Sequence, residues 1–366
     1  MPGRSFKVGA AAFVGCLLLI TPSVAAAVPD QATASENGRG VGAGSPFEAA
    51  QAVRSNGEWA LTWRLRHPGP VSVDVSADRG QTWQPAAKLV RTGELNVPAQ
   101  TSEPRPWFRL RLGGDAVVVA ARSLGVPSVA NLRDLGGYRT ASGEWVRMGR
   151  IYRSNALTVA PADRAAVDSL GIRAVYDLRT AAEAAQTPDV VPSGASRELH
   201  DVMGAGVPGP AATTADAAAD TMRRLEQVFV DDPASRAEFG QVITDLATRA
   251  GVQLFHCTGG KDRTGWAAAV VLTLLGVDKD TVMADYLLSN EYVLDSPGAQ
   301  AYLASLSPAD RAVAEAFVRV EPSYLQAGLD EVAAKYGSMH QYAIEGLGVS
   351  PETIARLRGA MLYGGR

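Results

Sequence analysis

The feature that most constrains this fold is the segment from His256 to Gly265, with the sequence HCTGGKDRTG. Residues 251–255 before it have the composition of a buried strand, and residues 266–275 after it are mostly Ala, Val and Leu. A strand that enters a helix through a glycine-containing loop is typical of an α/β layer. The loop N–H groups and the helix dipole converge on one point, which therefore favours an anion.

Two side chains of this segment suit phosphate chemistry. The field that attracts an anion also favours a thiolate, so Cys257 is predicted to be a nucleophile at neutral pH. Arg263 follows at C-x5-R spacing, where its guanidinium can grip two phosphate oxygens. A structural cysteine before a solvated turn is the alternative, but it leaves the paired glycines and the arginine unexplained. The sequence therefore predicts a cysteine site that cleaves phosphate esters.

The segment resembles the signature loop of the protein tyrosine phosphatase superfamily. Its Gly-Lys-Asp-Arg core is similar to the atypical bacterial branch, whose members act on phosphotyrosine and often on phosphoserine, phosphothreonine or phosphoinositides. The resemblance runs from about Val126 to the C-terminus and implies an α/β fold, a tyrosine-phosphatase-like sheet flanked by helices. The other stretches that fit the branch are NLRDLGGY (131–138), IYRS (151–154), VYDLR (175–179) with Glu183, DYLLSN (285–290) and YGS (336–338).

The resemblance assigns roles within the loop. Cys257 attacks phosphorus and forms a phosphocysteine, which water then hydrolyses. Arg263 and the loop amides stabilise charge on the transferred group, and the Thr264 hydroxyl bonds the cysteine sulfur. Capping of the following helix is the simpler role for Thr264. The expected phosphate-binding residues are Thr258, Gly259, Gly260, Lys261, Asp262 and Arg263.

The general acid is less well defined, because the Trp-Pro-Asp loop of many tyrosine phosphatases is absent. The resemblance nominates Asp262, inside the loop itself. Asp177 is the second candidate, although an ion pair or loop brace with Arg179 is the favoured interpretation of this residue. His256 is expected to orient the loop by hydrogen bonds, and Lys261 adds positive charge that suits a further anionic group on the substrate.

Residues 1–27 have the pattern of a signal peptide: positive charge from Arg4 and Lys7, a short apolar stretch and three alanines. The apolar stretch is too short for a comfortable membrane span, so we expect an exported chain, extracellular or at the cell surface, without an integral span after cleavage. Lipidation of Cys16 is the alternative. Cleavage leaves Cys257 as the sole cysteine, which suits a nucleophile better than a packing residue.

Net charge and histidine spacing limit the classes of partner and cofactor that this chain is expected to bind. A formal charge of −3 gives no general attraction to nucleic acid or to an anionic membrane. The expected partner is a phosphorylated protein or a phosphoinositide. The histidines lack the spacing of metal ligands, so neither a metal nor a cofactor is expected; they are His67, His200, His256 and His340.

Two domains are predicted after a flexible leader at residues 28–45. Short alternating runs separated by turns predict a small all-β sandwich of the fibronectin or immunoglobulin kind at residues 46–124, and its role is left open. Within it, Asp78 and Gly80 are expected to shape a hairpin turn. Residues 125–366 form the predicted catalytic domain, in which residues 204–235 are either a mobile lid or a surface insertion.

The predicted function is therefore that of a secreted, cysteine-dependent phosphatase acting on phosphotyrosine, with phosphoserine and phosphothreonine as further candidate substrates. A phosphoinositide or inositol phosphate phosphatase using the same site is the alternative. A surface protein that binds through the β-domain and retains an inactive phosphate pocket ranks below both.

Overall fold

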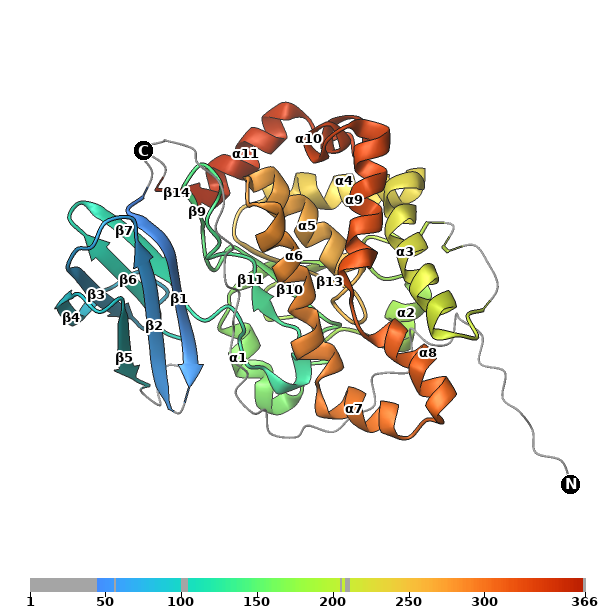
Figure 1. Ribbon diagram of the computed structural model, residues 1–366, viewed down its shortest axis with the longest axis horizontal. Helices are drawn as coiled ribbons and strands as arrows, with labels where there is room; N and C mark the ends of the chain where they lie inside the picture. Colours follow the sequence, from blue (N-terminus) through green and yellow to red (C-terminus); the bar gives the residue numbers. More distant parts are fainter. Residues whose placement is uncertain (1–44, 56, 100–104, 205, 208–210, 365–366) are drawn as a thin grey trace, which may run out of the picture.

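The computed structural model describes residues 45–364, apart from residues 56, 100–104, 205 and 208–210 (Figure 1). The predicted signal peptide at residues 1–27, and all but the last residue of the predicted leader at 28–45, lie outside this part of the chain. No helix in the described part is long and apolar enough to cross a membrane.

The N-terminal part consists of two antiparallel sheets, which Figure 1 shows packed beside the larger helical body. Alternation explains the strands: in β2, Trp59, Leu61 and Trp63 are buried and point to one face. The all-β part of the predicted fold class is thereby confirmed. One sheet has the order β1 (Phe47–Ser55), β2 (Glu58–Leu65), β5 (Glu94–Pro98), and the other β4 (Gln84–Val90), β3 (Val71–Ser76), β6 (Trp107–Leu112), β7 (Asp115–Val119).

The hairpin between β3 and β4 has the turn chemistry expected from its sequence. The Asp78 carboxylate accepts hydrogen bonds from the backbone N–H and the hydroxyl of Thr82, at 2.8 and 2.6 Å. Gly80 has a φ of +84°, a conformation that glycine adopts without strain. Trp83 is only half-buried, under the guanidinium of Arg109, and does not belong to the apolar core of the sandwich.

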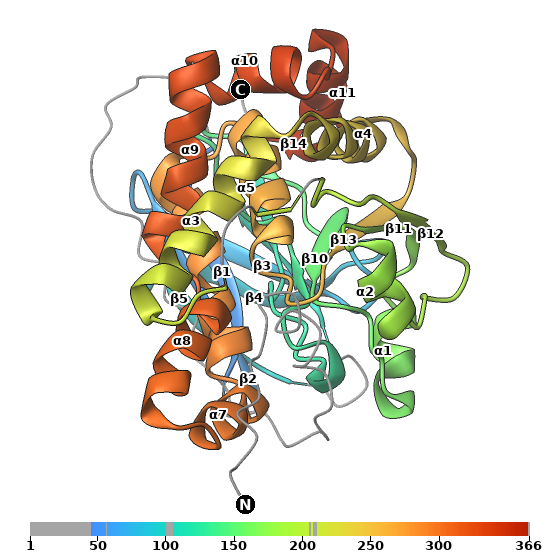
Figure 2. The ribbon, with the colours of Figure 1, turned by 90° about the vertical axis from the view of Figure 1, so that its right-hand side faces the viewer.

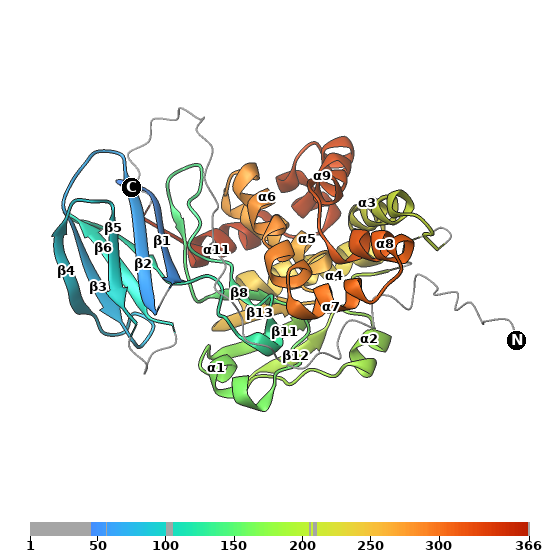
Figure 3. The same cartoon turned by 60° about the horizontal axis from the view of Figure 1, so that its bottom comes forward.

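The C-terminal part is built on a five-stranded sheet of order β12-β11-β13-β10-β8, in which all neighbours are parallel except β8. Figure 3 shows α1 and α2 on one side of this sheet and the remaining helices on the other. The predicted α/β class is confirmed. The strands are β8 (Arg133–Asp134), β10 (Ile151–Ser154), β11 (Ile172–Asp177), β12 (Ser196–Leu199) and β13 (Val252–His256).

Helix α5 (Arg263–Leu275) is the central helix, and nearly all of its residues are buried. The helix begins three residues earlier than the apolar run predicts, so Arg263 lies in its first turn. It ends at Gly276, which has a left-handed φ of +88° as a helix C-cap requires. Apart from α3, which is described below, the other α-helices are α1 (Arg164–Asp168), α2 (Ala181–Gln186), α4 (Pro233–Thr248), α6 (Lys279–Leu287), α7 (Pro297–Ala304), α8 (Pro308–Val318), α9 (Pro322–Tyr336), α10 (Met339–Gln341) and α11 (Pro351–Met361).

The prediction of a lid or surface insertion at residues 204–235 does not fit most of that segment. Helix α3 (Ala215–Asp231) occupies it and lies beside α8 and α9, as Figure 2 also shows. Its residues Met222, Leu225 and Phe229 belong to the main hydrophobic core. Displacing α3 as a lid would expose this apolar surface to water, at a cost of about 25 cal/mol per Å².

The two parts of the molecule are joined by more than a linker. A small sheet pairs β9 (Trp145–Val146) with β14 (Leu362–Tyr363) at the C-terminal end of the chain. Trp145 is buried in the core of the sandwich, and the Tyr363 hydroxyl accepts a hydrogen bond of 3.0 Å from the N–H of Val118 in β7. Residues assigned by sequence to the catalytic domain thus complete the sandwich core.

Candidate active site

The predicted signature loop lies at the carboxyl edge of the parallel strands. Register pairs His256 with Ser154 of β10 and with Asp177 of β11, so these strands end together. Cys257 follows directly after β13. Open parallel sheets bind ligands at this edge, where loops can surround a small molecule.

The loop packs so closely on β10 that one of its positions requires glycine. Gly260 has a φ of +69°, and a Cβ atom placed there would lie 2.4 Å from the carbonyl oxygen of Ser154 and 2.5 Å from the backbone nitrogen of Asn155. Any side chain at residue 260 would displace the loop from the end of the strand. The second glycine of the motif therefore sets the loop's position as well as its shape.

Four buried side chains beneath the loop, Asn131, Arg133, Arg153 and Asp285, form what we call the loop floor. The Asn131 amide donates to the carbonyl oxygens of Gly259 and Gly260, at 3.1 and 2.9 Å, and Arg153 donates to the second of these at 2.9 Å. The floor thus holds two loop carbonyls, which leaves the loop N–H groups free to face the opposite side.

The two arginines of the loop floor share a single carboxylate, so the floor keeps an excess of one positive charge. The Asp285 carboxylate bonds both Arg133 and Arg153 and accepts a further hydrogen bond of 2.9 Å from the Tyr138 hydroxyl. Burial on its own would raise the pKa of Asp285, but the two guanidinium groups outweigh burial and hold it below its usual range. Sequence alone did not assign this role to the DYLLSN segment.

Glu183, Thr258 and Arg263 form a second group, the loop rim. Glu183 accepts two hydrogen bonds from the Arg263 guanidinium, at 2.7 and 2.8 Å, and one of 2.7 Å from the Thr258 hydroxyl. Burial would raise the pKa of Glu183, but Arg263 lowers it to about 2. Glu183 is fixed in turn by a capping box with Thr180 at the start of α2, and the pattern T-x-x-E is the sequence signal for that cap.

Lys261 and Asp262 form an ion pair within the loop. The Lys261 Nζ lies 2.9 and 2.8 Å from the two carboxylate oxygens of Asp262, and its side chain is 9% exposed. Asp262 precedes the first turn of α5 but does not cap it through its side chain. The Asp262 carboxylate is therefore held by the neighbouring lysine rather than by the start of the helix.

Cys257 and Thr264 are both buried in this closed loop. Cys257 is only 2% exposed, and the Thr264 hydroxyl is buried without a hydrogen-bond partner among the described residues. Neither a bond from Thr264 to the sulfur nor a helix cap is present.

The other two predicted residues lie behind the loop. Both oxygens of the buried Asp177 carboxylate are bonded by Arg179, at 2.8 Å each, and Arg197 also contacts it. His256 Nδ1 lies 3.2 Å from the carbonyl oxygen of Cys257, and its Nε2 lies 3.3 Å from Asp189. These contacts suit Asp177 as a structural brace and His256 as a residue that orients the loop. No sequence pattern pointed to Asp189, because only the folding of the chain brings it next to His256.

Two clusters have the ligand types of a metal site, and arginines occupy both. In the first, Arg179 and Arg197 bond both carboxylates of the cluster Asp177, Asp189 and His256. In the second, Arg249 bonds Glu198 and Asp245 beside His200. Each guanidinium already supplies the positive charge that a cation would bring, so these donor sets do not fit a metal ion well.

One further carboxyl group belongs to the surroundings of the loop. Glu226 of α3 is fully buried, its Oε1 lies 3.4 Å from the Tyr286 hydroxyl, and its Oε2 has no partner among the described residues. Burial, assisted by the negative charges of Asp262 and Cys257, raises the pKa of Glu226 well above its usual range. Tyr286 in turn packs on Gly265 in the first turn of α5.

A cysteine and an arginine in an anion-binding loop, at the carboxyl edge of a parallel sheet, define a protein of the phosphatase class. Residues 124–363 match the model of the tyrosine phosphatase family. The chain belongs to this family and is a protein-tyrosine phosphatase, a hydrolase of phosphoric monoesters.

Three proteins with similar sequences illustrate the family. A Cupriavidus necator protein whose name assigns it to the tyrosine-protein phosphatases is 35% identical over 257 residues, 68% of this chain and 92% of its own length. The triple specificity protein phosphatase PtpB of Mycobacterium tuberculosis is 31% identical over 287 residues, 67% of this chain and 100% of that protein. A tyrosine-protein phosphatase of Nostoc commune is 31% identical over 212 residues, 54% of this chain and 68% of its own. The predicted family is thereby confirmed.

Proposed function

We propose that the enzyme hydrolyses phosphotyrosine through a covalent phosphocysteine on Cys257. The observation that carries this proposal is the position of Cys257 at the start of a loop whose carbonyls are tied down and whose following helix begins at Arg263. Such a loop directs its N–H groups and the helix dipole toward one anion, next to the thiol.

The reaction takes two steps. The Cys257 sulfur attacks phosphorus, an S–P bond forms, the ester O–P bond breaks, and Asp262 gives its proton to the departing oxygen. Water then attacks phosphorus, Asp262 takes the proton, and the S–P bond breaks to release inorganic phosphate and the thiolate. Lys261, bonded to Asp262, holds its carboxyl group at the mouth of the loop.

The loop rim supplies the phosphate clamp. Arg263 presents a guanidinium already oriented by two bonds to Glu183, so little rotamer freedom is lost when substrate arrives. The expected phosphate contacts are the loop amides from Thr258 to Arg263 and this guanidinium. His256 and Asp177 act as positioning residues behind the loop.

Phosphoserine and phosphothreonine are proposed as further substrates, and phosphoinositides as the alternative class. PtpB is named for triple specificity, and Lys261 at the loop gives this chain a cation for an additional anionic group. The non-catalytic alternative is weaker, because the nucleophile, the clamp and the acid candidate all stand in one loop. Export is proposed as well, on the n-region, apolar stretch and alanines of residues 1–27.

Steady-state kinetics on an aryl phosphate test the proposal. Cys257→Ser is expected to remove turnover, and Asp262→Asn to slow a substrate with a poor leaving group more than one with a good leaving group. Phosphotyrosine, phosphoserine and phosphothreonine peptides and phosphoinositides are then compared with and without EDTA. Unchanged turnover in Cys257→Ser, or loss of activity in EDTA, would refute the mechanism.

A further inference from the structure

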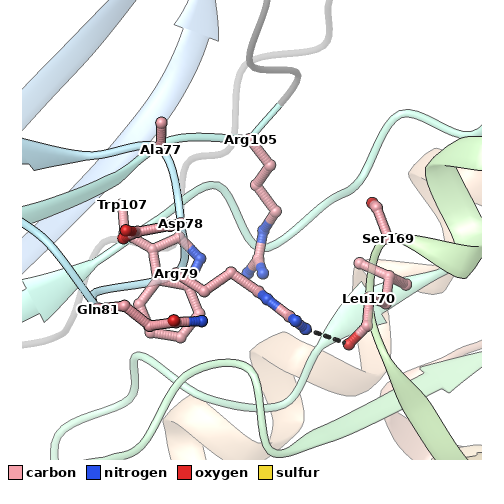
Figure 4. A pocket seen from close by; sticks show the side chains of 8 residues that line it. All are labelled: Ala77, Asp78, Arg79, Gln81, Arg105, Trp107, Ser169 and Leu170. Atoms are coloured by element: carbon pink, nitrogen blue, oxygen red, sulfur yellow. Dashed lines mark hydrogen bonds between the residues drawn. The ribbon is translucent and has the colours of Figure 1, made fainter.

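The sandwich lies outside the residues that match the phosphatase family, yet it contacts the catalytic part through two arginines. Arg79, in the hairpin after β3, donates to the carbonyl oxygen of Leu170 at 2.6 Å. Arg105, just before β6, reaches Asp134 of β8 and Tyr152 of β10. Both line one cleft of about 280 Å³ between the two parts, and Figure 4 shows them side by side there.

Arg105 is the more deeply embedded of the two. Its guanidinium donates to Asp134 at 2.6 Å, to the Tyr152 hydroxyl at 3.1 Å and to the carbonyl oxygen of Ala121 at 2.8 Å. Its side chain is 10% exposed, and the Asp134 side chain is fully buried. A buried carboxylate requires such a partner, since an unpaired charge in the interior is strongly unfavourable.

Asp134 uses its remaining capacity to fix the chain around it. Its Oδ1 accepts from the N–H of Gly136 at 2.8 Å, and its Oδ2 accepts from the N–H of Gly149 at 2.6 Å. These two glycines flank the segment that connects β8 to β10. The sandwich arginine, through Asp134, therefore sets the geometry of both strands.

The same two strands carry two members of the loop floor, Arg133 and Arg153, next to the partners of Arg105. Register pairs Asp134 with Tyr152, the two partners of Arg105, and Arg133 with Arg153, two members of the floor. Neighbouring residues of a strand point to opposite sides. Arg105 thus holds one side of the strand pair, while the other side holds Asp285 and, through Arg153, the carbonyl oxygen of Gly260.

We propose that Arg105 is a positioning residue for the phosphate-binding loop, and that the sandwich serves catalysis by fixing β8 and β10 under that loop. This role rests on the proposed function of the loop. Loss of Arg105 leaves Asp134 without its cation and Tyr152 without this donor, so the strand pair shifts and the Gly260 carbonyl moves with it.

Arg79 provides a matched control. It is an arginine of the same sandwich and bridges the same cleft. Its acceptor Leu170, however, lies just before β11, at the amino-terminal ends of the parallel strands, whereas the loop lies at their carboxyl ends. Replacing Arg79 removes a bridge between the two parts but leaves the hydrogen bonds of Arg105 to the strand pair in place.

The test compares Arg105→Met, Arg105→Lys, the double variant Arg105→Met/Asp134→Asn, and Arg79→Met. The double variant removes both charges together and serves if the single variant fails to fold. Amide hydrogen exchange of residues 258–263 is measured first, because it requires no turnover. Values of kcat/KM for an aryl phosphate and the inhibition constant of inorganic phosphate follow.

Every folded Arg105 variant is expected to exchange faster in the loop than the wild type. Their kcat/KM should fall about ten- to a hundredfold, because small misplacements of reacting groups have effects of this size. Arg79→Met should match the wild type in both measurements. The proposal would be overturned if loop amides of the Arg105 variants exchanged as slowly as those of the wild type. It would also be overturned if Arg79→Met changed exchange and kcat/KM as much as the Arg105 variants do. Faster loop exchange in an enzyme whose Cys257→Ser form remains active would refute the proposed mechanism and leave this inference standing.

Discussion

The loop floor and the loop rim hold the same loop by different means. The floor is fully buried, and its two arginines share the single carboxylate of Asp285. The rim is partly open, with the Glu183 side chain 16% exposed. Its carboxylate orients Arg263 and Thr258, which are expected to contact phosphate. The comparison indicates that the floor fixes the loop's shape before substrate arrives, whereas the rim keeps the clamp oriented until phosphate joins it.

Removing the floor's carboxylate should have the largest effect. Asp285→Ala leaves Arg133 and Arg153 buried without their counter-charge, which typically costs about 3–5 kcal/mol. Urea unfolding should show a lower midpoint, and activity should be lost because the Gly260 carbonyl loses its support. Asp285→Asn is the matched control for volume. If Asp285→Ala lowered the free energy of unfolding by less than about 1 kcal/mol, the floor would not be the main support of the loop.

Removing the rim's carboxylate should affect activity more than stability. Glu183→Gln keeps the size of the side chain but weakens its grip on Arg263 and Thr258. We expect kcat/KM to fall about tenfold, equivalent to about 1.4 kcal/mol, with a small change in the unfolding midpoint. An unfolding midpoint as low as that of Asp285→Ala would contradict the distinction between rim and floor.

The buried Glu226 gives a pH test with a defined sign. Its pKa is raised in the folded protein, so the folded state retains a proton that the unfolded state releases. The contribution of Glu226 to stability therefore decreases as pH rises above about 4.5. Glu226→Gln does not titrate and should raise the melting temperature more at about pH 8 than at about pH 5. An increase independent of pH would mean that Glu226 is ionised in the folded protein.

Glu183 should show the opposite sign. Its pKa of about 2 lies below the value of 4.5 for an ordinary glutamate, so its contribution to stability is complete above about pH 4.5 and is lost as pH falls toward 2. The difference in unfolding free energy between wild type and Glu183→Gln should shrink over that acid range. A constant difference would show that the bond to Arg263 does not depend on the carboxylate charge.

Local patterns predicted much of this molecule. The apolar runs around the loop placed β13 and α5, and alternation identified several sandwich strands, because periodicity depends on which face is buried. The C-x5-R spacing placed Cys257 and Arg263 in one loop. These features involve residues close together in the chain, where the sequence itself carries the geometry.

Contacts between distant residues were not predictable in this way. Glu183 reaches Arg263 across 80 positions, and Asn131 reaches Gly260 across 129. Trp145 belongs to the sandwich core although it comes from the other part of the chain, and α3 is a core helix where a lid or a surface insertion was expected. Such partners are set by the packing of the whole sheet, which leaves no fixed spacing in the sequence.

The central claim is that Cys257 carries the phosphoryl group during turnover. Its most direct test is acid quenching of the enzyme within the first turnover of an aryl phosphate, followed by digestion and mass spectrometry. The peptide that contains Cys257 should gain the mass of one phosphoryl group, and Cys257→Ser should show neither this adduct nor turnover. Rapid product formation with an unmodified Cys257 peptide at every quench time would contradict the account.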